Sequence, residues 1–206
     1  MSSAFVQFAK IGRLKRGMVI TEKIDGTNAQ ILIEACADLS NGGDCADGLI
    51  AVNHELELSM FAGSRNRYLT PEADNFGFAR WVNTYANALW ALGPGRHFGE
   101  WWGSGVQRGY GLTNGEKRFS LFNTGRWNGD RPPPACCRIV PVLHTGMFDT
   151  AVIDEVIADL ARTGSRAAPG FSRPEGIVIF QSATGTLFKR TIDHDDEPKG
   201  AQHERI

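Results

Sequence analysis

A lysine two residues before an aspartate is the feature of this chain that most suggests chemistry. The heptad 22–28 reads Glu-Lys-Ile-Asp-Gly-Thr-Asn and follows the apolar run 18–20, so Lys23 is expected at the end of a strand. Lysine is a poor nucleophile at its ordinary pKa of about 10.4, and it needs burial or neighbouring cations that lower this pKa. The same pattern also describes an ordinary strand that runs into a turn.

Four later segments contain side chains that could act together with this lysine. Glu100 lies among aromatic residues and glycines, where a ribose hydroxyl could satisfy a half-buried carboxylate. Phe122 ends an alternating strand and could stack on a base. Glu175 directly precedes an apolar strand and could hold Mg²⁺. The adjacent cations Lys189 and Arg190 suit an α-phosphate.

Each of these side chains also has a purely structural explanation. Glu100 could pair with a surface arginine, and Phe122 could pack in the core. Glu175 could cap a strand, and the two cations could lie solvated at a sheet edge. For three of the four segments, the structural explanation is the stronger one when the segment is taken alone.

Composition indicates a globular protein. The chain has 206 residues, of which 42% are hydrophobic and 22% charged. It contains no apolar run of about 20 residues and no secretory leader at its N-terminus, so a cytoplasmic protein with no membrane partner is expected. The net charge of −1 gives no global basic field, although 16 of the 22 cations are arginine. Arginine suits phosphate recognition, and GC-rich coding produces the same excess.

The cysteine pattern does not predict a metal site. Cys36, Cys45, Cys136 and Cys137 form no C-x-x-C pair, and two adjacent cysteines chelate one zinc ion poorly. Free, reduced thiols are expected.

Strand and helix signals alternate and predict one α+β domain over residues 1–206, with antiparallel sheets and two main helices. Thr70 and Pro71 have the residue types of a helix N-cap and first helical position, and this helix is expected to end at Gly93. A second helix is predicted from about Asp149 to Gly164. The predicted strands cover 17–24, 28–35, 49–52, 58–63, 96–102, 118–123, 176–181 and 186–192, with a surface loop over 36–48 and a flexible tail over about 195–206.

In their order and spacing, these segments resemble the motifs of the covalent nucleotidyltransferase superfamily of ATP-dependent polynucleotide ligases and mRNA capping enzymes. The resemblance is strongest to the RNA ligase branch, extends over about residues 18–200, and includes small RNA-ligase-like proteins of phages and bacteria. The matching segments are Lys23–Gly26 for motif I, Phe98–Trp101 for motif III, Arg118–Asn123 for motif IIIa, Glu175–Val178 for motif IV and Lys189 for motif V. Residues 63–67, Gly-Ser-Arg-Asn-Arg, resemble the arginine motif that contacts phosphate.

The resemblance implies a fold and an activity. The implied fold is an α+β ligase adenylation domain of the ATP-grasp-like kind, with antiparallel sheets flanked by helices and without a C-terminal OB-fold. The implied activity is that of an ATP-dependent RNA ligase: Lys23 attacks the α-phosphate of ATP to form lysyl-AMP, AMP passes to a 5′-phosphate RNA end, and a 3′-hydroxyl seals the strand. RNA ends or nicks are the implied substrate, with ATP and Mg²⁺ or Mn²⁺ as the implied nucleotide and metal.

The resemblance also implies roles for individual residues. The implied catalytic residues are Lys23, Asp25 and Lys189. The implied nucleotide ligands are Glu22, Lys23, Asn28, Arg65, Glu100, Phe122, Glu175 and Lys189, with Glu175 at the metal, and Arg67 and Arg190 at nucleic-acid phosphate. In this scheme Glu100 binds ribose, and Phe122 stacks on adenine, with an aromatic of 98–102 as the competing choice.

Two features depart from the family pattern. Motif V usually carries two lysines one residue apart, whereas Leu187 and Thr191 flank Lys189 at that spacing, which leaves Arg190 as the candidate second cation. The family also commonly has a C-terminal domain, and this chain ends soon after motif V. The orientation of pyrophosphate therefore stays open, as does the contribution of an accessory domain or protein.

Three alternative functions stay open. A DNA ligase carries the same motifs, and so does a capping-type guanylyltransferase, which would use GTP and usually has an OB-fold. A non-catalytic nucleotide- or RNA-binding module would need no nucleophile, so the retention of Lys23, Glu100, Glu175 and Lys189 argues against it.

Overall fold

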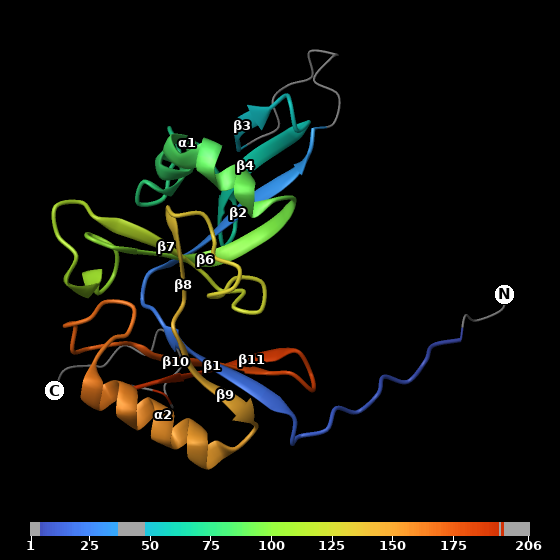
Figure 1. Ribbon diagram of the computed structural model, residues 1–206, viewed down its shortest axis with the longest axis vertical. Helices are drawn as coiled ribbons and strands as arrows, with labels where there is room; N and C mark the ends of the chain where they lie inside the picture. The colour runs from blue at the N-terminus through green and yellow to red at the C-terminus, as the bar shows by residue number, and fades with distance from the viewer. Residues whose placement is uncertain (1–4, 37–47, 194, 196–206) are drawn as a thin grey trace, which may run out of the picture.

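Two β-sheets, each covered by one α-helix, form the framework of the protein. The computed structural model describes residues 5–36, 48–193 and 195. In Figure 1 the larger sheet with its helix α1 (Phe78–Leu89) lies above the smaller sheet with its helix α2 (Thr150–Thr163). This mixed α+β architecture, with mainly antiparallel sheets, confirms the predicted fold class.

The smaller sheet is antiparallel throughout and has the strand order β11-β10-β1-β9. The larger sheet has the order β3-β4-β2-β6-β7-β8, with β5 paired to β4, and only β7 and β8 run parallel. The strands are β1 (Gly17–Lys23), β2 (Thr27–Ala35), β3 (Leu49–Asn53), β4 (Leu58–Ser64), β5 (Tyr68–Leu69), β6 (Gly95–Gly103), β7 (Lys117–Leu121), β8 (Cys137–Ile139), β9 (Val142–Met147), β10 (Gly176–Gln181) and β11 (Thr186–Thr191), and the short 3-10 helices are η2 (Trp90–Leu92) and η3 (Gly109–Gly111).

All eight predicted strands are present in the structure, and three further strands were not predicted. The confirmed strands are β1, β2, β3, β4, β6, β7, β10 and β11. The additional strands β5, β8 and β9 are short or lie at sheet edges. The predicted loop over 36–48 and the predicted tail lie largely outside the described residues.

An aromatic cluster holds α1 against the larger sheet. The Phe78 ring lies 5.4 Å from that of Trp101 on β6 and 5.1 Å from that of Phe119 on β7, measured between centroids. The Trp81 ring extends the cluster at 5.2 Å from Trp101. Tilted aromatic pairs at these separations add stabilisation beyond the burial of apolar area. This face of the sheet is therefore filled, and the opposite face is the one that remains open.

The first helix begins at Phe78, not at Pro71 as predicted from the sequence. Thr70 Oγ1 accepts a hydrogen bond from the Ala73 N–H and so caps a local turn instead of a helix. Asp74 stabilises the true helix start, because its carboxylate accepts hydrogen bonds from the N–H groups of Ala79 and Arg80. Phe76 and Gly77 have φ values of 51° and 84°, which a right-handed helix cannot contain.

The second helix agrees with its prediction at both ends. Asp149 is the N-cap, and its Oδ1 accepts a hydrogen bond of 2.9 Å from the Ala151 N–H. The helix ends before Gly164, whose φ of 84° favours glycine. Its apolar face packs on the smaller sheet, in a core that includes Met18, Ile20, Ile153, Leu160, Ile177 and Ile179.

The chain passes from one sheet to the other immediately after Lys23. Strands β1 and β2 do not pair with each other; β1 lies in the smaller sheet and β2 in the larger one. Gly26 lies in this crossing against β6, and a Cβ atom there would lie 2.5 Å from the Trp101 carbonyl oxygen and 2.8 Å from the Trp102 Cβ. The crossing therefore places the end of β1 beside β6, and it requires glycine.

The remaining sequence expectations concern thiols and membranes. Cys36, Cys136 and Cys137 are free, and Cys45 lies outside the described residues. Within the described part of the chain, no helix has both the length and the apolar character needed to cross a membrane.

Phe78→Ala is expected to lower the free energy of unfolding by about 3–5 kcal/mol, because it removes a fully buried ring from the aromatic cluster. Denaturant unfolding measures this change. Tyr85→Ala, which removes a ring that is 43% exposed on the same helix, is the matched control and should cost less than about 1 kcal/mol. Equal losses of unfolding free energy in Phe78→Ala and Tyr85→Ala would contradict the assignment of Phe78 to the core.

Candidate active site

The Lys23 ammonium and the Glu175 carboxylate form an ion pair at the point where the two sheets meet. Lys23 is the last residue of β1 and pairs in register with Gly176, the first residue of β10. Glu175 immediately precedes β10, and its Oε2 lies 2.6 Å from Lys23 Nζ. The two side chains are only 20% and 9% exposed, so water screens this pair weakly.

Glu100 adds a second carboxylate beside this pair, from the other sheet. It lies on β6 opposite Asn28 of β2, and it accepts hydrogen bonds from the Asn28 Nδ2 at 3.1 Å and the Gly26 N–H at 3.2 Å. Burial raises the pKa of Glu100 from 4.5 to about 7, although the Asn28 hydrogen bond and the positive charge of Lys23 act in the opposite direction. Near neutral pH this carboxyl group is therefore close to its midpoint of ionisation.

Arg108 and Tyr110 fix the loop that follows Lys23. The Tyr110 hydroxyl accepts a hydrogen bond of 2.9 Å from the Asp25 N–H, and Arg108 Nε donates one of 3.1 Å to Asp25 Oδ2. The Arg108 guanidinium also donates to the carbonyl oxygens of Arg173 and Pro174, directly before Glu175. Arg108 therefore ties the loop after β1 to the segment before β10.

The sequence prediction did not include Arg108 and Tyr110 among the site residues. Both follow the Phe98–Trp101 segment that resembles motif III by fewer than ten residues, and this proximity was the available signal. Their positions depend on a loop in which Gln107 and Tyr110 have positive φ values of 45° and 51°. Such backbone geometry is uncommon for residues other than glycine and is not predictable from residue type.

Two half-exposed aromatic rings lie next to Glu100 on the same face of the larger sheet. Phe98 and Phe122 are 51% and 41% exposed. The Phe122 N–H donates a 3.0 Å hydrogen bond to the Phe98 carbonyl, so the two residues lie opposite each other. Phe98 is two residues from Glu100 along β6, and side chains two residues apart share a face. Either ring can offer a flat surface to a base.

Lys189 and Arg190 point to opposite faces of the smaller sheet. Lys189 lies opposite Val178, and Val178 lies opposite Thr21, two residues from Lys23 on the same face. Arg190 lies on the other face, where it pairs with Asp154 of α2 and, at 3.5 Å, with Asp195. The structure therefore brings Lys189, and not Arg190, to the Lys23 side of the sheet.

Glu22 also points away from Lys23. Its buried carboxylate accepts hydrogen bonds from Ser165 Oγ at 2.6 Å and from the N–H groups of Arg166 and Ala167 at 2.8 and 2.9 Å. These contacts anchor the loop after α2. The Glu22 carboxylate, predicted as a nucleotide ligand, thus fills a structural position behind the strand, because adjacent residues of a strand face opposite sides.

The two predicted arginines of the 63–67 segment differ in their surroundings. Arg67 donates hydrogen bonds to the carbonyl oxygens of Tyr68, Ala73 and Asp74, which occupies its guanidinium with the backbone. Arg65 is exposed in the turn that follows β4, near the end of β2 that carries Asn28. Arg65 is therefore the better placed of the two for an incoming phosphate.

Glu175 is the side chain best suited to a divalent ion. The described residues contain no cluster of three or more His, Cys, Asp or Glu side chains that could form a metal cage. Mg²⁺ is often held by one or two carboxylates together with substrate phosphates, so a single carboxylate beside Lys23 is compatible with an ion that arrives with a nucleotide.

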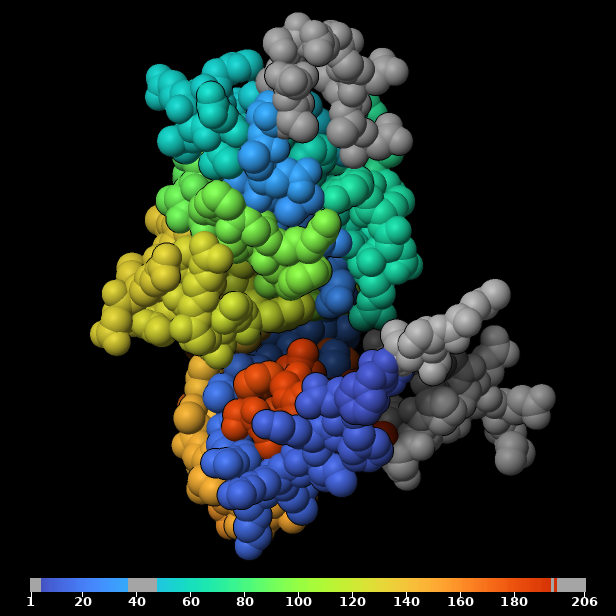
Figure 2. Space-filling view, turned by 90° about the vertical axis from the view of Figure 1, so that its right-hand side faces the viewer, coloured from blue at the N-terminus to red at the C-terminus, as the bar shows by residue number. Residues whose placement is uncertain are grey.

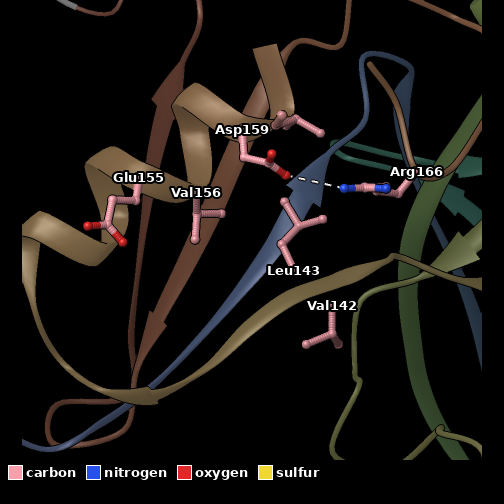
Figure 3. Close-up of a pocket in the computed structure, with 7 residues that line it drawn as sticks. Val142, Leu143, Glu155, Val156, Asp159 and Arg166 are labelled. Carbon is pink, nitrogen blue, oxygen red and sulfur yellow. Dashed lines mark hydrogen bonds and ion pairs between the residues drawn. The ribbon is translucent and has the colours of Figure 1, made fainter. Parts of the chain in front are cut away.

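A hollow separates the two sheets on one side of the molecule. Figure 2 shows a hollow between the green upper part of the molecule and the orange-red β11 below it, with blue early residues at its floor. A separate pocket of about 530 Å³ lies between α2 and β9 and is drawn in Figure 3. Its lining includes none of the candidate site residues, and the Asp159–Arg166 ion pair spans one side of it.

Comparisons with known proteins show the family and the fold of this chain. The RNA ligase family matches residues 16–191, and the chain belongs to that family. A lysine-to-alanine mutant of Naegleria gruberi RNA ligase with ATP and Mn is similar in fold, with a TM-score of 0.52 and 17% identity over 85% of this chain and 49% of that chain. A second lysine-to-alanine mutant without ligand has a TM-score of 0.53 and 18% identity, with the same coverage of both chains. The chain thus spans about half the length of these structures, and comparison with curated proteins gave no match.

The raised pKa of Glu100 predicts a specific pH dependence of stability. Between pH 4.5 and about 7 the folded state binds the Glu100 proton more tightly than the unfolded chain, so stability falls as the pH rises through this window. The free energy of unfolding of Glu100→Gln, relative to that of wild type, should therefore rise by up to about 3 kcal/mol between pH 5 and pH 8.

Denaturant unfolding at several pH values measures this difference. Glu34→Gln, on an exposed position of β2, is the matched control and should follow the wild-type curve. If the free energies of unfolding of wild type and Glu100→Gln change in parallel with pH, the raised pKa of Glu100 is contradicted.

Proposed function

We propose that this protein is an ATP-dependent RNA ligase that works through a lysyl-adenylate on Lys23. The observation that carries the proposal is the 2.6 Å contact between Lys23 Nζ and Glu175 in a member of the RNA ligase family, with Glu100 close enough for the Lys23 charge to influence its pKa. We further propose that residues 1–206 act as one adenylation domain.

The proposed reaction has three steps. The lone pair of the neutral Lys23 Nζ forms a bond to the α-phosphorus of ATP while the bond to the pyrophosphate oxygen breaks, and the nitrogen loses one proton to solvent. A 5′-phosphate oxygen of RNA then attacks the same phosphorus, the nitrogen–phosphorus bond breaks, and the lysine nitrogen takes up a proton as it leaves. Finally a 3′-hydroxyl attacks the activated 5′-phosphate, losing its proton, and AMP leaves as the strand is sealed.

The first step requires a neutral amine at the nucleophile. In the described arrangement the Glu175 carboxylate pairs with the Lys23 ammonium, so the proton must leave and the pair must separate before attack. Asp25 is held by Arg108 and by the Tyr110 hydroxyl, and it keeps the loop that carries the lysine in one position. The contribution of these groups is to orient Lys23 toward the phosphorus.

The other site residues bind the nucleotide. Glu100 accepts hydrogen bonds from ribose hydroxyls, with Asn28 beside it, and Phe122 stacks on adenine. Lys189 and Arg65 neutralise phosphate charge in the transition state. Glu175 is the residue that would hold Mg²⁺ or Mn²⁺ beside the triphosphate. A bound divalent ion supplies charge neutralisation on the phosphate oxygens.

Lys23→Ala is expected to abolish covalent labelling when the protein is incubated with α-labelled ATP and Mg²⁺, because it removes the proposed nucleophilic amine. Lys117→Ala, which removes a lysine of β7, is the matched control and should label as wild type does. Persistent label on Lys23→Ala would sink the nucleophile assignment. Labelling with GTP in place of ATP would favour a capping-type guanylyltransferase, and absence of pyrophosphate release with every nucleotide would favour a binding module.

The RNA substrate is tested by strand joining. Wild type should join nicked or single-stranded RNA with a 5′-phosphate at least about tenfold faster than matched DNA, a difference of roughly 1.4 kcal/mol in transition-state stabilisation. Gel analysis of labelled strands with ATP and Mg²⁺ measures both rates. Faster joining of nicked DNA would identify a DNA ligase and contradict the proposed substrate.

A further inference from the structure

One row of residues crosses the face of the larger sheet that α1 leaves open. The row runs from the candidate site to the far edge of that sheet. Paired residues on five adjacent segments form this row, since residues directly opposite in register share a face. Its members, which we call the aromatic row, are Phe122, Phe98, Gln30, Gly63 and Tyr68.

The aromatic row lies on the face that α1 does not cover. The α1 helix packs against the alternate residues of the same strands, among them Ile31 and Trp101. Tyr68 at one end of the row is 39% exposed, and Phe98 and Phe122 at the other end are 51% and 41% exposed. In Figure 2 light-blue and green atoms, the colours of β2 and β6, are visible above the hollow.

Arg96 contacts two members of the row, Gln30 in its middle and Tyr68 at one end. Its guanidinium donates hydrogen bonds to Gln30 Oε1 at 2.8 Å and to the Tyr68 hydroxyl at 3.4 Å. Gln30 is fixed in turn, because its Nε2 donates to the Ser64 carbonyl at 3.0 Å. Gly63 leaves room for this amide, since a Cβ there would lie 2.9 Å from the Gln30 Cγ.

The resulting surface is a series of planar groups with one fixed positive charge. Aromatic rings and arginine planes are the groups on which the bases of single-stranded RNA stack, while arginine also attracts the phosphate backbone. Exposed aromatics gathered on one face of a soluble protein usually mark a binding surface. The charge of Arg96 within the row favours a polyanion over an apolar peptide.

We propose that the aromatic row with Arg96 binds the single-stranded RNA next to the end that is joined. This inference rests on the proposed function, because the row begins at Phe122 and Phe98 beside the nucleotide site. From Phe98 to Tyr68 the row crosses three strand spacings, roughly 14 Å in all. That length holds about four stacked nucleotides at about 3.4 Å each.

The test measures RNA binding and lysyl-AMP formation separately. Binding of a fluorescent 12-nucleotide single-stranded RNA is followed by anisotropy at one fixed salt concentration. Tyr68→Ala and Arg96→Gln should each raise the Kd at least about fivefold, and Tyr68→Phe, which keeps the ring, should stay near the wild-type Kd. All three variants should form lysyl-AMP from ATP as wild type does.

The controls lie elsewhere on the surface. Tyr85→Ala removes an exposed ring on α1, and Arg162→Gln removes an exposed arginine on α2. Both should bind the RNA as wild type does. Wild-type affinity in Tyr68→Ala and Arg96→Gln, or equal losses in the controls, would overturn the inference and would leave a protein partner as the occupant of this face.

The two proposals fail in distinguishable ways. If the row variants lose RNA affinity but wild type forms no lysyl-AMP, the RNA surface stands and the ligase assignment fails. If wild type forms lysyl-AMP and the row variants keep full RNA affinity, the ligase assignment stands and the RNA surface fails. Should Tyr68→Ala prove unstable, Arg96→Gln alone decides, because Arg96 lies on the surface.

Discussion

The contact between the Lys23 ammonium and the Glu175 carboxylate is the interaction around which the rest of the structure is arranged. Two poorly exposed charges are tolerated only as a pair, and removal of either partner leaves the other uncompensated. Lys23 ends β1, and Glu175 directly precedes the adjacent strand β10. Further contacts fix the chain next to each of the two residues. Glu22 anchors the loop after α2 behind the lysine, and Arg108 ties the Asp25 loop to the segment before β10. These contacts hold the segments on either side of the lysine in place.

The sequence predicted the fold where local signals and packing agree. Helix α2 has an Asp149 cap, a glycine stop and an apolar face, and its prediction was right at both ends. The predicted start of α1 was wrong because Thr70 and Pro71 suit a turn as well as a helix. The hydrogen bond from the Ala79 N–H to Asp74 marks the later start that the structure shows. Strands β8 and β9 were missed because β8 has only three residues and β9 contains Gly146, a weak strand former.

The site was predictable in its residue types and less so in its geometry. The order of motifs identified Lys23, Glu100 and Glu175, which the structure brings together from both sheets. It could not decide which side of a strand faces the site, since a shift of one residue exchanges the two faces. For this reason Glu22 and Arg190, each adjacent in sequence to a lysine of the site, were expected there and instead point to the α2 side.

Locating the bound AMP on the protein itself tests directly whether Lys23 is the nucleophile. Wild type is incubated with ATP and Mg²⁺, digested under conditions that preserve the phosphoramidate, and analysed by tandem mass spectrometry. AMP is expected on Lys23, in the peptide that spans the end of β1 and the crossing to β2. AMP on any other residue, or no adenylated peptide from protein that releases pyrophosphate, would contradict it.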